Sequence, residues 1–121
     1  MTAFEMNHPH LWHRHYVRNA TAWNHWFDLY AGVVDHYLQR FGEDFCIVIV
    51  GSRTHDDTFV LPYALLRRFL TKVGLDSRRR WVGTIVDGQF RLTRGGVSIP
   101  VDMFRNAFGL LAWFPQKEAA A

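Results

Sequence analysis

The chain has 121 residues, of which 49% are hydrophobic and 16% aromatic, and its formal charge is +3 at pH 7. This length and composition predict one domain over residues 1–121 with a sizeable core, and flexible ends at 1–8 and 115–121. No apolar run approaches the roughly 18 residues that a membrane-spanning helix needs, and no signal peptide is expected. Cys46 is the only cysteine, which excludes a disulfide framework and favours a cytoplasmic location.

The charge is unevenly distributed along the chain. Residues 1–65 hold four Lys/Arg and seven Asp/Glu, a formal charge of −3, whereas residues 66–121 hold ten and four, a formal charge of +6. Twelve of the fourteen basic residues are arginine, the residue best suited to bidentate phosphate contacts. A basic half rich in arginine indicates a polyanionic partner, most often nucleic acid, although a solvated basic surface without a partner would look the same.

Residues 1–18 are expected to be irregular or to hold one short helix. Histidines alternate there with aromatic and basic residues: His8, His10, Trp12, His13, Arg14, His15, Tyr16 and Arg18. Imidazole is a common metal ligand, but only Glu5 lies close enough in sequence to complete a ligand set, so we expect no metal. We favour a segment in which His and Arg side chains contact phosphates.

Residues 21–41 carry apolar side chains at helical spacing throughout, and Gly42 follows as a stop. The pattern therefore predicts one long helix whose aromatic stripe faces the core. Residues 46–51 form a run dense in β-branched side chains, which predicts a buried strand. After the polar turn 52–57, which presents Arg53, residues 58–61 are expected to return as the second strand of a hairpin.

A helix is predicted to follow this hairpin directly. Pro62 suits a first helical position, and apolar residues then recur at helical spacing until Gly74. Tyr63, Arg67 and Arg68 are placed on the outer side. The helix would have an apolar inner face, a basic outer face and an exposed Pro-Tyr-Ala corner at its start.

The C-terminal half predicts a second hairpin and a last helix. Residues 76–80 form a loop with three consecutive arginines, and Asp87-Gly88 joins two alternating stretches, 81–86 and 89–93, which is a strong hairpin signal. Residues 97–101 read as an edge strand because of Pro100. Asp102 is expected to cap a helix over 103–111. The fold class is therefore α+β: a small, mostly antiparallel, barrel-like sheet flanked by three to four helices.

The sequence lacks several motifs of catalysis. Neither lysine, Lys72 or Lys117, stands two residues after a carboxylate, as one nuclease motif requires. Phosphate-binding glycine loops and the His-Glu-x-x-His pattern are absent as well. Cys46 lies in an apolar run and reads as an inert thiol. A catalytic triad assembled in space stays open, but we expect a binding protein without a cofactor rather than an enzyme.

The strand that runs into Leu-Pro-Tyr-Ala-Leu, with His13-Arg14 upstream and an arginine cluster downstream, resembles the sulfur-binding domains of McrA-type (type IV) restriction endonucleases. The resemblance covers most of residues 10–112. It implies recognition of double-stranded DNA whose backbone carries a phosphorothioate, with a nuclease module in the same system. The sequence departs from the family pattern at Leu61, where an aromatic residue is expected before the proline.

The resemblance also implies site residues. Pro62 would form the floor of a shallow apolar pocket for the sulfur, with walls from Leu61, Tyr63, Ala64 and Leu65. A further set would hold the DNA backbone or reach base edges: His13, Arg14, Arg53, Arg67, Arg68, Arg78, Arg79 and Arg80. Sulfur is more weakly hydrated than oxygen, so an apolar pocket would penalise the ordinary phosphate oxygen more than the sulfur.

Two alternatives stay open. The same elements are compatible with a B3-like or PUA-like reader of a methylated base or short DNA sequence, with Trp81 or Tyr16 in an aromatic cage. A protein-interaction module using the surface from Tyr63 to Arg68 is the other. Salt-dependent binding to DNA is expected of a DNA reader but not of a protein-interaction module.

Overall fold

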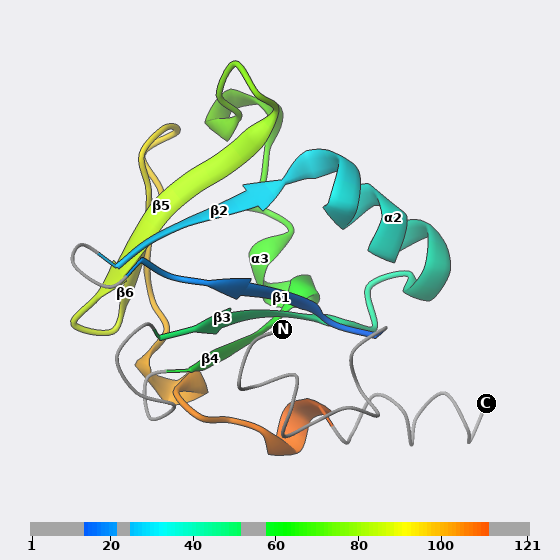
Figure 1. The fold of residues 1–121 in the computed structure, drawn as a ribbon, viewed down its shortest axis with the longest axis vertical. Helices are drawn as coiled ribbons and strands as arrows, with labels where there is room; N and C mark the ends of the chain where they lie inside the picture. The colour runs from blue at the N-terminus through cyan, green and yellow to red at the C-terminus, as the bar shows by residue number, and fades with distance from the viewer. Residues whose placement is uncertain (1–13, 22–24, 52–57, 112–121) are drawn as a thin grey trace.

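The computed structural model describes residues 14–21, 25–51 and 58–111 (Figure 1). The two ends expected to be flexible, 1–8 and 115–121, lie outside the described residues. The elements, in chain order, are β1 (Tyr16–Asn19), β2 (Trp26–Tyr30), α2 (Ala31–Phe41), β3 (Cys46–Val50), β4 (Phe59–Pro62), α3 (Tyr63–Leu66), the 3₁₀ turn η3 (Lys72–Gly74), β5 (Arg80–Val86), β6 (Gln89–Leu92), β7 (Ser98–Pro100) and the 3₁₀ turn η4 (Asp102–Phe104).

The strands form two sheets, with the orders β1-β3-β4 and β2-β5-β6-β7. All the pairings are antiparallel except that of β1 with β3, which is parallel and is connected through β2 and α2. The described part of the chain therefore has the predicted α+β class and mostly antiparallel pairing. It differs from the prediction in having two open sheets rather than one barrel-like sheet, because β1 and β2 share no ladder.

Side chains bridge β1 and β2 where the two sheets meet. The backbone N–H of Tyr30 donates to the hydroxyl oxygen of Tyr16 at 3.1 Å, and Arg18 Nε donates to the carbonyl oxygen of Asp28 at 3.1 Å. Beyond the turn between them the two strands diverge, as Figure 1 shows. The junction between the sheets is thus closed by side-chain hydrogen bonds instead of backbone pairing.

The main core lies between the two sheets. Phe27 and Leu29 of β2 pack with Ile47 and Ile49 of β3, and Val34 of α2 joins the same cluster. The opposite face of β3 is also buried, by a smaller cluster that includes Val48 and Leu111. Burial on both faces explains why this strand reads as a continuous β-branched run rather than as an alternation.

Both predicted hairpins are confirmed. β3 and β4 pair with Ile49 opposite Phe59. β5 and β6 pair around Asp87-Gly88, whose φ angles of 52° and 72° are those of the expected two-residue turn. The alternation in β5 puts Trp81, Gly83 and Ile85 on the buried side. β7 lies at the edge of its sheet, as Pro100 predicts.

The prediction of one helix over residues 21–41 was wrong in its first half. Residues 26–30 form β2, which pairs with β5 from Trp26 opposite Thr84 to Tyr30 opposite Arg80. The aromatic spacing fits a helix, but Phe27 and Leu29 also stand two positions apart, as residues on one face of a strand do. Pairing with β5 selected the strand over the helix. The prediction for residues 1–18 was also wrong in part, because residues 16–19 form β1.

The helix predicted after Pro62 is also shorter than expected. Pro62 ends β4 instead of opening the helix, and α3 makes a single turn. Thr71 adopts an extended conformation, and its carbonyl oxygen accepts a hydrogen bond from Trp81 Nε1 at 2.8 Å. α3 has already ended at Leu66, and Val73, beyond Thr71, is 77% exposed rather than part of an inner face.

The last predicted helix, 103–111, is interrupted. Asp102 makes no side-chain cap bond, and η4 ends at Phe104. Asn106 has a φ of 54°, outside the helical region. Its backbone N–H donates to the carbonyl oxygen of Thr58 at 2.6 Å, and its side-chain oxygen accepts from the Thr58 N–H at 3.3 Å. The helix therefore does not continue through Asn106, because this residue is hydrogen-bonded to Thr58 at the start of β4.

Candidate nucleic-acid interface

The outer face of the β2-β5-β6-β7 sheet carries aromatic and basic side chains. Residues that alternate with the buried ones point outward, and the register places Trp26, Thr84, Arg91 and Ser98 in one row across the four strands. Tyr30 stands beside Arg80 at the far end of the same pairing. Tyr30 is exposed and Trp26 is partly exposed. Within this sheet the sequence thus produces a face with stackable rings and cationic groups.

Asp28 holds two of the cations on this face. Its carboxylate is only 7% exposed, and it pairs with Arg18 and, at 3.2 Å, with Arg80 Nη1. The Arg80 guanidinium also lies 5.3 Å from the centroid of the Trp26 ring, and the Arg18 guanidinium lies 5.7 Å from that of Tyr30. These contacts fix the two rings and the two arginines in one rigid cluster.

Asp76 organises the arginine loop. One carboxylate oxygen accepts the backbone N–H of Arg78 at 2.9 Å and of Arg80 at 3.1 Å, while the other accepts Arg80 Nε at 2.7 Å. Desolvation works in the opposite direction, but the hydrogen bonds from Arg80 and Arg78 lower the pKa of Asp76. Asp76 therefore stays anionic and holds the Arg80 side chain in an ion pair within the protein. Arg78 and Arg79 remain exposed at the tip of the turn.

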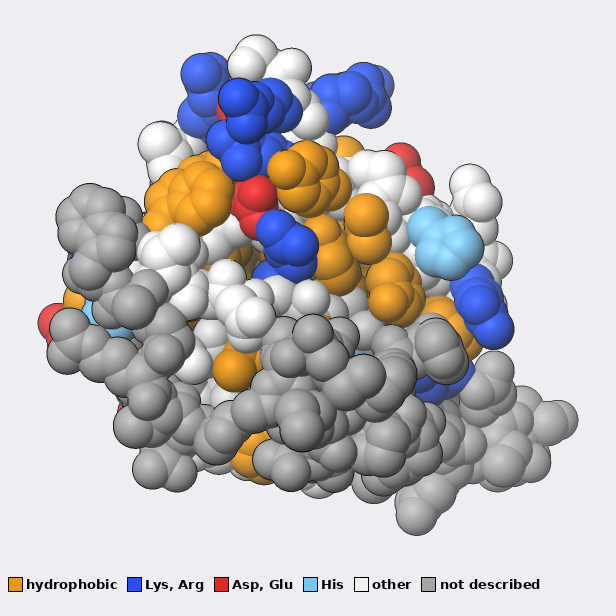
Figure 2. Space-filling view, viewed as in Figure 1, with side chains coloured by type: hydrophobic (Ala, Val, Ile, Leu, Met, Phe, Trp, Pro, Cys, Tyr) orange, Lys and Arg blue, Asp and Glu red, His pale blue; other side chains and the backbone are white. Residues whose placement is uncertain are grey.

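Neighbouring segments bring further basic residues to this end of the sheet. Gly74 of η3 packs against the turn after β6: a Cβ atom on Gly74 would lie 3.6 Å from the carbonyl oxygen of Arg94. Four exposed basic residues, for which the described part of the chain provides no ion pair, define what we call the basic end: Lys72, Arg78, Arg79 and Arg94. Figure 2 shows Lys and Arg side chains gathered at the end of the molecule where β5 begins.

A groove of about 250 Å³ lies beside the basic end. Trp26, Val82 and Thr93 contribute its sheet side, and Arg80 and Arg94 contribute cationic walls. Asp76, which pairs with Arg80, adds a carboxylate to the lining. It is large enough for one flat ring or one phosphate group, and its walls offer both stacking and charge. The sequence analysis did not find this groove, because Trp26 was assigned to a helix and Arg94 was not singled out.

The residues proposed for a sulfur pocket do not all reach the surface. Leu61 is fully buried, and Tyr63 is buried with its ring stacked on Phe45 at a centroid distance of 4.9 Å. Desolvation, together with nearby Glu43, raises the pKa of Tyr63. Pro62 is partly exposed, and Ala64 and Leu65 are exposed. Only these three offer apolar surface to a ligand, and none of them lines the groove.

The remaining predicted contacts divide into three groups. Arg14 is buried: its guanidinium donates to the carbonyl oxygen of Asp44 at 3.0 Å and lies 4.7 Å from the centroid of the Phe41 ring. Arg67 is exposed but pairs with Glu43 at 3.0 Å, whereas Arg68 is exposed without an ion pair in the described residues. His13 and Arg53 lie outside the described residues.

The aromatic residues considered for a base cage are core residues. Trp81 is buried and donates its Nε1–H to Thr71, and Tyr16 is buried with its hydroxyl bound by the Tyr30 N–H. Neither ring can contact a ligand without unfolding part of the core. A base reader built on this fold therefore needs other residues.

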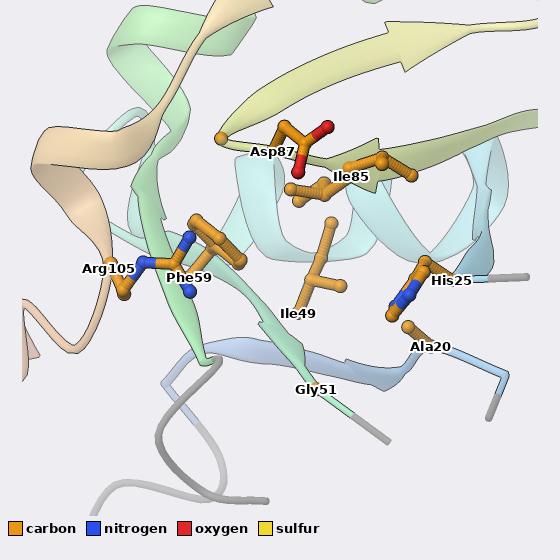
Figure 3. Close-up of a pocket in the computed structure, with 10 residues that line it drawn as sticks. Ala20, His25, Ile49, Gly51, Phe59, Ile85, Asp87 and Arg105 are labelled. Atoms are coloured by element: carbon orange, nitrogen blue, oxygen red, sulfur yellow. The ribbon is translucent and has the colours of Figure 1, made fainter. Parts of the chain in front are cut away.

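A second cavity, of about 220 Å³, lies at the opposite end of β5 and is lined by residues of both sheets (Figure 3). Phe59 and Ile85 line it together with three polar residues from separate segments, His25, Asp87 and Arg105. Nothing in the sequence pattern pointed to this site. Asp87 read only as a turn residue, and the other two stood in predicted helices.

Two further features bear on chemistry. Cys46 is buried, and desolvation raises the pKa of its thiol to about 12 although the Arg14 charge acts in the other direction. Among the described residues no three His, Cys, Asp or Glu side chains are grouped as a metal site would require. In the same residues, no helix combines the length and apolar character that crossing a bilayer demands.

Comparison with known protein families, curated proteins and solved structures finds no match to this chain. The interpretation of the basic end and of the two cavities therefore rests on their geometry and chemistry.

Proposed function

We propose that this chain is a DNA-binding module that contacts the phosphate backbone with its basic end. The observation that supports the proposal is the contrast among its arginines. Arg14, Arg18 and Arg80 are held by the protein's own oxygen atoms, whereas Lys72, Arg78, Arg79 and Arg94 project from adjoining turns without an ion pair in the described residues. Exposed cations kept apart from carboxylates are suited to phosphate groups.

The cluster around Asp28 gives these side chains a rigid support. Its two arginines neutralise the buried Asp28 carboxylate, and Arg80 also pairs with Asp76, the carboxylate that lines the groove. The sheet register also holds Trp26 next to the groove, where its ring can pack on a sugar or an exposed base. A cytoplasmic location belongs to this proposal, since DNA and a free thiol are both compatible with it.

A mobility-shift titration at several salt concentrations tests the proposal. Each phosphate contact to B-DNA contributes about −0.9 to the slope of log K against log salt, so four contacts predict a slope of about −3 to −4. Replacing Arg78 by Gln should reduce the slope by about 1 and weaken binding to all sequences similarly.

Arg40 provides a matched control. It is exposed on α2, it carries no ion pair in the described residues, and Arg40→Gln removes the same charge. This variant should bind DNA like the wild type. Equal losses for both variants would show that net charge alone drives binding, and binding without any salt dependence would contradict the proposal.

The phosphorothioate specificity that the resemblance implies is a finer proposal. Pro62, Ala64 and Leu65 expose apolar surface close in sequence to Arg68, so a sulfur atom could be desolvated there beside a cation. The same titration with an unmodified duplex, a base-methylated duplex and both phosphorothioate stereoisomers tests it. We expect one stereoisomer to bind best, and Leu65→Gln to remove that preference while leaving binding to the unmodified duplex intact. Preference for the methylated duplex would favour a base reader instead.

A further inference from the structure

The cavity at the end of β5 has an apolar floor. Ile49 of β3, Phe59 of β4 and Ile85 of β5 line it, and all three belong to the main core. Ala20, Gly51 and Gly88 also line the cavity. A ligand here would cover apolar surface that the fold itself leaves unfilled.

Three polar side chains stand around this floor. Figure 3 shows Arg105 beside Phe59 on one side, Asp87 above Ile85, and His25 on the opposite side near Ala20. Arg105 is positioned by Asp102, whose carboxylate accepts its guanidinium at 3.2 Å, and by the Phe59 ring, 4.9 Å from its carbon Cζ. The rim thus offers a carboxylate acceptor, a guanidinium donor and an imidazole from three different segments.

Hydrogen bonds hold the backbone at this rim. His25 has a φ of 57° at the connection from β1 to β2. Its N–H donates to the carbonyl oxygen of Thr21 at 3.1 Å, and the Thr21 N–H donates to that of Trp26 at 2.8 Å. These bonds fix the position of His25 beside the cavity.

We propose that this cavity binds a nucleobase. A base has apolar faces for the Ile49, Phe59 and Ile85 floor, and its edge carries the donors and acceptors that Asp87, Arg105 and His25 would complement. The volume of about 220 Å³ is below the usual range for whole small-molecule ligands, so sugar and phosphate would stay outside. The base comes either from bound DNA, in which case the inference rests on the proposed function, or from a free nucleoside.

Two measurements on the full chain distinguish these sources. Free deoxynucleosides, including methylated ones, are titrated into isotope-labelled protein and followed by the amide NMR signals of residues 85–88. Separately, a duplex with a central mismatched 2-aminopurine is titrated with protein and its fluorescence is recorded. The fluorescence should increase if the base is extruded, because the base then loses its stacking neighbours. The nucleoside titration needs no DNA binding, so it remains informative if the proposed function fails.

Asp87→Asn is the test variant, because Asn-Gly keeps the two-residue turn while the carboxylate charge is lost. Loss of one charge-assisted hydrogen bond should weaken nucleoside binding about tenfold. Arg40→Gln should leave nucleoside binding unchanged within about twofold, because Arg40 is exposed on α2 and does not line the cavity.

The outcomes separate as follows. A fluorescence increase that Asp87→Asn abolishes, while the duplex stays bound, assigns the cavity to an extruded base. Nucleoside shifts at residues 85–88 without a fluorescence increase assign it to a free nucleoside. The inference is overturned if wild-type protein gives neither signal, or if Asp87→Asn leaves both signals unchanged.

Discussion

At the scale of single residues, two carboxylates determine which arginines can meet a ligand. Asp28 and Asp76 together hold Arg18 and Arg80. Removing one partner from such a half-buried cluster would leave an uncompensated charge, so the cluster acts as a structural support. Arg78 and Arg79 flank the same loop but stay exposed, because Asp76 binds the backbone N–H of Arg78 rather than its side chain.

His15 makes folding sensitive to acid. It is buried, and its Nδ1 accepts the Cys46 N–H at 2.9 Å. Burial, with a smaller effect from the Arg14 charge, lowers its pKa from 6.5 to about 4. Between these values the unfolded chain binds the additional proton, so the free energy of unfolding should decrease as pH falls from about 6.5 to about 4. The contribution is about 3 kcal/mol.

Urea unfolding of the wild type and His15→Gln at pH 7, 5.5 and 4.5 checks this prediction. The variant should be less stable at pH 7, because the glutamine replaces the buried ring, but its stability should change less with pH. If both proteins lost the same free energy across this range, His15 would not be the responsible group.

At the scale of elements, close approach of β5 and β6 depends on one glycine. A Cβ atom on Gly83 would lie 2.0 Å from the carbonyl oxygen of Arg91, so the pairing leaves no room for a side chain. Gly32, in the first turn of α2, has nothing within 4 Å of the same added atom. The two positions thus form a matched pair for testing the sheet register.

Gly83→Ala should destabilise the protein by more than about 3 kcal/mol, or prevent folding, because backbone atoms of β6 would have to move. Gly32→Ala should stabilise it by up to about 1 kcal/mol, since alanine restricts the unfolded chain and favours the helix. Thermal unfolding of both variants measures the difference. A tolerated alanine at position 83 would contradict the register of β5 with β6.

At the scale of the whole molecule, one core joins two sheets, and side chains of β1 and β2 bridge their edges. β5 spans the length of the second sheet. It begins at Arg80, next to the basic end, and ends at Val86, which lines the cavity. The two proposed contact regions are therefore held at a fixed separation by one strand.

Cys46 reports on the opening of the whole molecule. It is fully buried in β3, where the two clusters of core residues share the strand. The thiol should not react with Ellman's reagent in the native state at pH 8, because burial raises its pKa to about 12. One thiol should react in denaturant. Rapid reaction of the native protein would show that this sheet opens locally.

Local sequence patterns were sufficient for the strands that end in strong turn signals. The β-branched run at β3 and the Asp87-Gly88 turn predicted both hairpins, because those signals depend on neighbours along the chain. A loop over residues 76–80 was predicted as well. Arg78 and Arg79 are exposed in it, whereas Arg80 begins β5.

Tertiary contacts decided the rest. Trp26–Tyr30 fits both a helix and a strand by its own spacing, and only pairing with β5 selected the strand. Asp28 reaches Arg80 across fifty-two positions of sequence, so no local pattern could show that this arginine is already paired. The cavity lined by His25, Asp87 and Arg105 likewise forms only when the fold brings these three residues together, because they are far apart in the sequence.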